Sequence, residues 1–174
     1  MAPPGIFITT AAEVDAASLA TFAARTFRET FGCDNTSEDM DAYVALHFNE
    51  QRQRAELRDP SCLALLVHSG TQLVGYAQLM ESSDPPRAIS APAIEIQRFY
   101  VESAHHGTGI AQALMRECIV ASSDRGFAAV WLGVWERNPR AIAFYRKSGF
   151  VDLGSQPFVL GDDLQTDRIM LRSL

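Results

Sequence analysis

The sequence predicts a mixed fold of the α/β (α+β) class, and three consecutive segments predict it. A strand-like pattern at residues 93–101 is followed by a glycine-containing turn and by a helical pattern at residues 110–124, where apolar side chains recur at helical spacing. An almost continuous apolar run then covers residues 128–134, as expected of a strand that is buried on both faces. Strand, helix and strand in this order make a βαβ unit.

The chain before residue 60 is predicted to be mostly helical, after a short β-branched strand at residues 6–9. Thr10 and Glu13 have the spacing of a capping box, in which the first and fourth side chains bond each other's backbone N–H groups. The helices expected here span residues 10–31, with Gly32 as the stop, begin near Thr36 with Asp39 at the capping position, and span residues 50–58.

The other elements are predicted from turn residues that separate apolar runs. Gly70 marks a hairpin turn, and a loop rich in Ser, Pro and Ala covers residues 82–92. Asn138 followed by Pro139 is typical of a helix start, and Gly149 closes that short helix. The further strands expected are residues 62–67, 73–80, 151–160 and 166–171, with the turn Gly161-Asp162-Asp163 between the last two.

Length and composition indicate one domain over residues 1–174 and exclude several partners. With 47% hydrophobic residues in 174, the chain can bury one core but not a second full-sized one. No apolar run approaches the ~20 residues that cross a bilayer, and no signal peptide precedes the first strand, so we expect a cytoplasmic protein without a membrane partner. A net charge of -6 opposes a nucleic-acid partner, which requires clustered Lys and Arg.

The placement of cysteine and histidine argues against metal and thiol chemistry. Cys33, Cys62 and Cys118 form no Cys-x-x-Cys pair and have no evident histidine partner in sequence. Buried free thiols are therefore expected, rather than a metal site or an acetyl-cysteine intermediate. His105 and His106 are adjacent and would not converge on one ion, so no metal is expected.

The turn before the helix at residues 110–124 is a candidate binding site for a phosphate group. The first N–H groups of a helix lack intrahelical partners, and glycines remove side chains that would keep an anion away from them. A nucleotide P-loop needs Lys after its glycine, and a dinucleotide fingerprint needs a small residue where Gln112 stands, so ATP and NAD are poor candidates. The residues of this turn are His106, Gly107, Thr108, Gly109, Ile110 and Ala111.

This turn resembles the acetyl-CoA pyrophosphate loop of the GNAT superfamily of N-acetyltransferases, whose pattern is Gln/Arg-x-x-Gly-x-Gly/Ala. Gly109 and Ala111 match it, whereas His106 replaces the usual Gln or Arg but can still donate a hydrogen bond to phosphate. A second family pattern, Asn-x-x-Ala-x-x-Phe-Tyr-x-x-x-Gly-Phe, is complete here. It begins at Asn138 and includes Ala141, Phe144, Tyr145, Gly149 and Phe150.

The resemblance implies a GNAT fold, with a central mixed, mostly antiparallel twisted sheet of about seven strands and about four flanking helices. Acetyl-CoA enters a splayed V between the fourth and fifth strands in this family. The implied reaction is transfer of the acetyl group from acetyl-CoA, a cosubstrate, to a primary amine by direct attack in a ternary complex. Because dimers are common in the superfamily, the resemblance also leaves a homodimer open.

The resemblance also implies roles for particular residues. Backbone groups of Phe99, Tyr100 and Val101 would hold the pantetheine arm and place an N–H near the thioester carbonyl, where negative charge develops. Asn138 would lie near the pantetheine. The hydroxyl of Tyr145 would face the thioester sulfur and protonate the departing thiolate.

Glu95 is the candidate general base, because an alkylamine must lose a proton before it can attack. An unpaired carboxylate in an apolar strand is costly, and burial raises its pKa toward a useful value. The alternative is that Glu95 forms an ion pair with Arg98 or another nearby cation. The sequence leaves both interpretations open.

Within the superfamily the chain is most similar to the PaiA-type polyamine N-acetyltransferases, in residues 26–32, 97–101 and 157–170. An acidic cluster in the first two helices suits a polycationic acceptor, although a solvated helix surface explains the same charges; its members are Glu29, Asp34, Glu38, Asp39 and Asp41. The alternatives are a protein N-terminus or lysine, an amino acid, an aminoglycoside-like amine, or a non-catalytic acyl-CoA-binding sensor.

Overall fold

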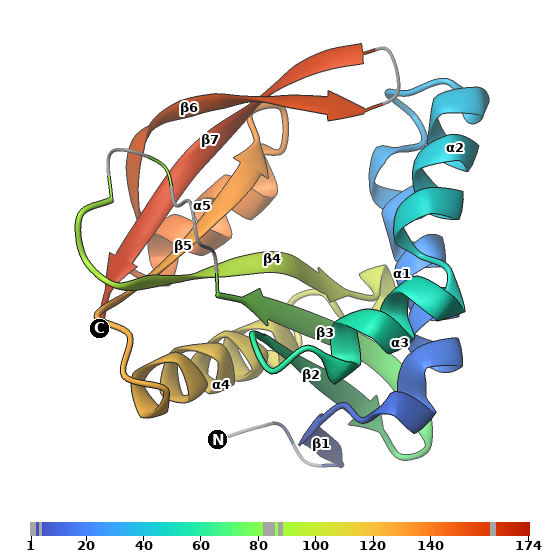
Figure 1. Cartoon of the computed structure of the whole chain (residues 1–174), viewed down its shortest axis with the longest axis horizontal. Helices are drawn as coiled ribbons and strands as arrows, with labels where there is room; N and C mark the ends of the chain where they lie inside the picture. Colours follow the sequence, from blue (N-terminus) through green and yellow to red (C-terminus); the bar gives the residue numbers. More distant parts are fainter. Residues whose placement is uncertain (1–2, 4, 82–85, 87–88, 161–162) are drawn as a thin grey trace.

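The computed structural model describes residues 3, 5–81, 86, 89–160 and 163–174, which include one seven-stranded sheet (Figure 1). Its strand order is β1-β2-β3-β4-β5-β7-β6, and every neighbouring pair is antiparallel except β4 and β5, which confirms the predicted mixed sheet. The strands are β1 (Ile6–Thr10), β2 (Cys62–Ser69), β3 (Gln72–Met80), β4 (Ala93–Val101), β5 (Ala129–Trp135), β6 (Val151–Leu160) and β7 (Asp163–Ser173).

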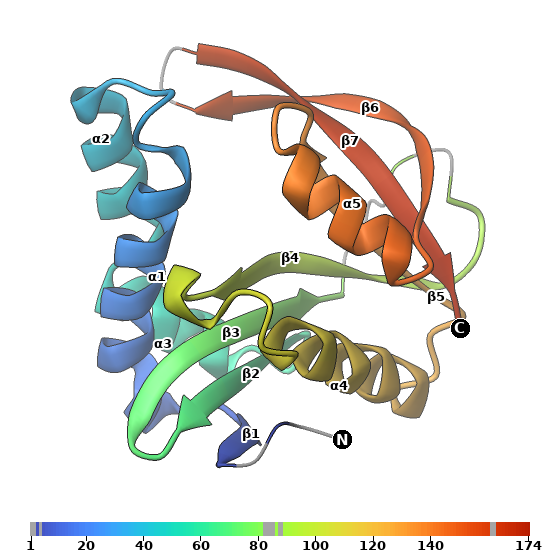
Figure 2. The same cartoon turned by 180° about the vertical axis from the view of Figure 1, so that it is seen from behind.

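Helices cover both faces of this sheet (Figures 1 and 2). They are α1 (Ala16–Phe31), α2 (Ser37–His47), α3 (Glu50–Arg58), α4 (Ile110–Asp124) and α5 (Pro139–Lys147). The described part of the chain thus has five α-helices at the five places expected from the sequence, where the family resemblance implied about four. The side chain of Asn49 accepts a bond from the Arg52 N–H at 2.8 Å and begins α3 as a helix separate from α2. Helices α4 and α5 pack on one face, and α1 to α3 pack on the other.

The predicted capping box at Thr10 is wrong. Thr10 pairs with Leu65 as the last residue of β1, so it remains extended. The chain then makes a 3-10 turn, Glu13–Asp15, where the Asp15 carboxylate accepts from the Ala12 N–H at 2.8 Å. The cap predicted at Thr36 is confirmed, since its hydroxyl oxygen accepts from the Asp39 N–H.

Strand β7 is longer at both ends than the predicted residues 166–171, because it pairs with β5 and β6 along its length. Two predicted connections lie partly outside the described residues. These parts are residues 82–85 and 87–88 of the loop and Gly161-Asp162 of the last turn.

The central feature of the sheet is a V between β4 and β5. In the described residues the two strands pair only from Ala93 to Glu95 and from Ala129 to Trp131. Beyond these pairs the strands separate, and the gap between their ribbons is visible in Figure 1. The register of β3 against β4 also shifts between Gln78 and Leu79, which bends β4 where it leaves β5. The splayed V that the family resemblance implied is therefore present.

Candidate active site

The turn that opens α4 has the backbone of an anion-binding loop. Gly107 and Gly109 have φ angles of 80° and 92°, values that glycine adopts without strain. A side chain at Gly107 would meet no atom within 4 Å, so the surface of the turn is open at that point. The first N–H groups of the 15-residue α4 follow directly. The main chain is therefore compatible with a phosphate group, and its binding there stays a prediction.

Both ring nitrogens of the His106 side chain contact other groups of the protein. Its Nε2 lies 2.8 Å from the Val101 carbonyl oxygen, which can only accept, so Nε2 donates. Its Nδ1 lies 2.6 Å from Nη1 of Arg140, which can only donate. In this geometry neither nitrogen is available as the phosphate donor that the sequence analysis expected.

Arg140 is the charged group that the sequence analysis missed at this turn. Its guanidinium is exposed and comes from the first turn of α5, next to Asn138 and Pro139. The family pattern did not reveal it, because Arg140 occupies an unspecified position of Asn-x-x-Ala. Its contact with the α4 turn depends on where α5 packs.

Asn138 and Tyr145 are positioned by the two ends of α5. The Asn138 Oδ1 accepts from the Ala141 N–H at 3.1 Å and caps the helix, so its Nδ2 hydrogens remain as donors. The Tyr145 ring is 8% exposed, and its centroid lies 6.2 Å from that of Phe99 on β4. Burial raises the pKa of the Tyr145 hydroxyl, with a smaller effect from Cys118, so the phenol is protonated at neutral pH.

The edge of β4 that faces the V carries backbone groups without a neighbouring strand. Phe99, Tyr100 and Val101 pair with β3 on their other side, and β5 has already diverged at this level. Backbone groups of a strand point alternately to its two sides, so part of this segment faces the V. An extended ligand inserted there can bond it as a strand would.

Glu95 lies at the closed end of the V and has no hydrogen-bond or ion-pair partner among the described residues. In the strand register Glu95 is paired with Trp131 of β5. Its side chain faces the α1–α3 side of the sheet, whereas Tyr145 packs on the α4–α5 side. Burial raises the pKa of the Glu95 carboxyl to about 7. An acid with this pKa is half ionised near neutral pH and suits proton transfer.

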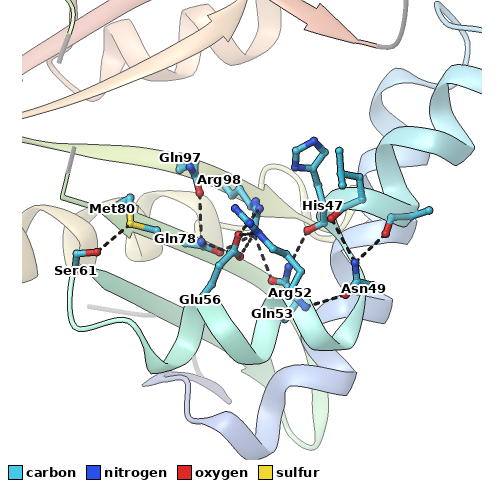
Figure 3. Close-up of polar contacts among 12 residues, drawn as sticks. His47, Asn49, Arg52, Gln53, Glu56, Ser61, Gln78, Met80, Gln97 and Arg98 are labelled. Atoms are coloured by element: carbon cyan, nitrogen blue, oxygen red, sulfur yellow. Dashed lines mark hydrogen bonds and ion pairs between the residues drawn. The ribbon is translucent and has the colours of Figure 1, made fainter. Parts of the chain in front are cut away.

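The alternative pairing of Glu95 with Arg98 is wrong. The Arg98 guanidinium bonds both carboxylate oxygens of Glu56 on α3, at 2.6 and 3.2 Å, as Figure 3 shows. It also donates to Gln53 and Gln78. Burial alone would raise the pKa of Glu56, but the bonds from Arg98 and Arg52 outweigh it and lower the pKa. Because the Arg98 guanidinium is paired with Glu56, it does not neutralise Glu95.

A second half-buried carboxylate, Asp167 of β7, was also missed. Burial raises its pKa to about 6, and no described residue bonds or neutralises it. Its Oδ2 lies over Gly133 of β5, where an added Cβ would be only 3.1 Å away. No local pattern marks Asp167, because its place depends on the strand order β5-β7-β6.

Most residues of the predicted acidic cluster already have bonding partners in or beside α1 and α2. Glu29 pairs with Arg25, Asp41 pairs with Arg28, and Asp39 bonds Thr36 at the start of α2. This favours the interpretation of a solvated helix surface for those three charges.

Other chemistries find little support in the described part of the chain. Burial raises the pKa of Cys62 to about 11 and raises that of the fully buried Cys118, so neither thiol forms a reactive thiolate near neutral pH. Cys33 is exposed, so the expectation of a buried thiol is wrong for that residue. The described residues contain no group of three His, Cys, Asp or Glu arranged to hold a metal ion. Among the described helices, none is both long and apolar enough to cross a membrane.

Comparison with known proteins agrees with this geometry. Residues 23–150 match the family model of the acetyltransferase (GNAT) family. An uncharacterized N-acetyltransferase of Mycobacterium tuberculosis is 34% identical over 160 residues, which cover 92% of this chain and 98% of that protein.

Two solved structures share the fold. The PaiA N-acetyltransferase of Thermoplasma acidophilum, in complex with coenzyme A, has a TM-score of 0.80 at 20% identity and covers 97% of this chain and 99% of that one. A spermidine N-acetyltransferase SpeG chimera from Vibrio cholerae and hSSAT has a TM-score of 0.67 at 18% identity, over 97% and 95% of the chains. With its matching family model, its open V and its glycine turn before α4, the chain belongs to the acetyltransferase (GNAT) family and is an acetyl-CoA-dependent N-acetyltransferase.

Proposed function

We propose that this enzyme acetylates a primary amine of a polyamine by direct attack in a ternary complex within one domain, residues 1–174. The observation that carries the proposal is that two carboxylates without bonding partners, Glu95 and Asp167, lie on the face of the V opposite to Tyr145. A site lined with uncompensated carboxylates favours a cationic acceptor over a neutral one. The spermidine N-acetyltransferase chimera with the same fold supports this acceptor class.

Several groups are proposed to hold acetyl-CoA, which supplies the acetyl group as a thioester. The backbone N–H groups from Gly107 to Ala111 bind the pyrophosphate, and Arg140 supplies the positive charge that His106 does not. The Asn138 amide donates to the pantetheine arm. The edge of β4 at residues 99–101, apart from the Val101 carbonyl that accepts from His106, bonds that arm and presents an N–H to the carbonyl oxygen of the thioester.

Two groups on opposite faces of the sheet are proposed to move protons. Glu95 accepts the proton of the incoming ammonium, directly or through water, because its pKa of about 7 leaves much of it ionised at neutral pH. The deprotonated amine then attacks the thioester carbonyl directly, without an enzyme-bound acetyl group, in agreement with the raised pKa of Cys62 and Cys118. As the C–S bond breaks, Tyr145 donates its hydroxyl proton to the departing thiolate. A cytoplasmic location and a homodimer stay predictions.

The test is amine-dependent release of CoA thiol from acetyl-CoA. We expect release with spermidine and spermine to exceed release with amino acids, aminoglycosides and N-terminal peptides, and to fall sharply in Tyr145→Phe. Release with another amine in place of polyamines would move the acceptor to that class. Binding of acetyl-CoA without release for any amine would favour the non-catalytic sensor.

A further inference from the structure

We infer that Asp167 and the aromatic rings around it form a subsite for the second, non-reacting ammonium of the acceptor. This inference rests on the proposed function and adds the group that distinguishes a polyamine from a monoamine. Asp167 projects from β7 toward the α1–α3 side, the same side as its cross-strand neighbours Trp135 on β5 and Gln156 on β6.

The carboxylate occupies a space that the sequence keeps clear. A Cβ added to Gly133 would lie 3.1 Å from Oδ2 of Asp167 and 3.3 Å from Nε2 of Gln156, so even alanine would require these side chains to shift by a few tenths of an ångström. Gly133 has ordinary strand geometry, because its φ is not positive. Glycine at this position therefore leaves space for the carboxylate and is not needed for a turn.

Trp135 and Tyr43 lie near this carboxylate, and each contacts a further aromatic ring. Trp135 is the direct cross-strand neighbour of Asp167, which places their Cβ atoms ~5 Å apart. The Phe31 ring lies 5.8 Å from that of Trp135, and the Phe158 ring of β6 lies 6.1 Å from that of Tyr43 on α2. Burial raises the pKa of Tyr43, Arg98 opposes the rise and Asp167 adds to it, so the phenol is within reach of the Asp167 charge.

This combination suits an alkylammonium ion. An ammonium is attracted both by a carboxylate and by the faces of Trp and Tyr rings, and the attraction grows when the site is partly closed to water. No described cation already occupies the carboxylate, since the neighbouring Arg168 points to the other face and pairs with Asp152. A half-buried carboxylate without a partner is costly, and a bound ammonium removes that cost.

The distance between Asp167 and Glu95 gives the two carboxylates different roles. Glu95 is level with Trp131, and Asp167 is level with Trp135, four residues further along β5. At the rise of a β-strand this separation is ~13 Å along the strand, so the two carboxylates cannot contact one nitrogen. One carboxylate can therefore serve the reacting amine through water while the other holds the remaining charge.

The experiment compares putrescine, which keeps a second ammonium, with n-butylamine, which lacks one. In Asp167→Asn we expect KM for putrescine to rise at least tenfold with kcat within twofold, while both constants for n-butylamine stay within twofold of wild type. Gly133→Ala is expected to raise KM for putrescine by a smaller factor, since an added Cβ shifts the carboxylate by only a few tenths of an ångström. Asp124→Asn removes an equal charge from an exposed position at the end of α4, on the other face of the sheet, and is expected to change nothing.

Calorimetric titration of putrescine into the CoA-bound protein separates this inference from the proposed function. If no amine is acetylated but putrescine binds to wild type and not to Asp167→Asn, the proposed reaction fails and the subsite stands. Unchanged putrescine binding or KM in Asp167→Asn overturns the subsite. An equal loss of kcat with both amines also overturns it, since that pattern belongs to a general base.

Discussion

The Nδ1 atom of His106 lies 2.6 Å from Nη1 of Arg140, which joins the turn before α4 to the first turn of α5. The other ring nitrogen bonds the last residue of β4, Val101. One imidazole thus connects the strand, the glycine turn and a guanidinium. In the proposed site His106 orients Arg140, and Arg140 takes the place of the Gln or Arg that the family usually has where His106 stands.

Replacing Arg140 with Gln should weaken CoA binding about tenfold, because one charge-assisted contact to phosphate is lost. At saturating acetyl-CoA, kcat should stay within about twofold. Calorimetric titration with CoA and with dephospho-CoA identifies the phosphate, since equal losses for both ligands point to the pyrophosphate. Arg137→Gln, an exposed arginine three residues away, is the matched control. An unchanged Kd in Arg140→Gln would remove this residue from the phosphate site.

Replacing Tyr145 with Phe should lower kcat about 100-fold and leave the Kd for acetyl-CoA within about twofold. The change removes only the hydroxyl proton, and a positioned general acid contributes on this scale. The ring contacts with Phe99 and Phe150 are kept, so the fold is expected to be preserved. Steady-state kinetics with a separate binding titration measure the two quantities. Near-normal turnover would exclude Tyr145 as the acid.

The pH profile should report Glu95. Because burial raises its pKa to about 7, a base at this position is lost as pH falls through 7, and log kcat/KM should drop with unit slope below that pH. Glu95→Gln should abolish this limb. The rise at higher pH that reflects deprotonation of the amine itself should remain. A limb near pH 7 that survives in Glu95→Gln would assign the base to another group.

The buried pair of Glu56 and Arg98 should dominate the stability of the α3–β4 contact. Glu56→Gln leaves a buried guanidinium with weaker partners, so the free energy of unfolding should fall by about 3 kcal/mol. Replacing both residues together, as Glu56→Leu with Arg98→Met, should recover most of the loss. Urea unfolding at pH 7 measures each value.

The control is the exposed pair of Glu50 and Arg54 on the same helix. Glu50→Gln should cost less than about 0.5 kcal/mol, because exposed pairs contribute little. The folded pKa of Glu56 is lowered, so its contribution is present above its unfolded pKa and is lost as the pH falls through the lowered value. Equal losses in Glu56→Gln and Glu50→Gln would contradict the account.

Predictions from the sequence held where a side chain and its partner are close in the chain. The caps at Thr36 and Asn138 each bond an N–H three residues on, so local spacing is enough to find them. The cap at Thr10 failed because β1 pairs that residue with Leu65, and a strand partner far along the chain outweighs a local signal.

The site divides in the same way. The glycine turn and Asn138 with Tyr145 carry sequence patterns, although their roles stay predictions. Arg140 and Asp167 do not stand out, because their neighbours His106 and Gly133 are brought to them by the packing of α5 and by the order of β5 and β7. The choice between a free and a paired Glu95 needed the position of Glu56, which lies on a helix outside the βαβ unit.

The most direct test of the central claim is a competition among acceptors. The protein is incubated with acetyl-CoA and an equimolar mixture of spermidine, n-butylamine, an amino acid, an aminoglycoside and an N-terminal peptide, and the products are separated by mass spectrometry. The account predicts that acetylated spermidine forms first and that Tyr145→Phe forms far less of it. An acetyl group found mainly on another amine, or on none while acetyl-CoA still binds, would contradict the account.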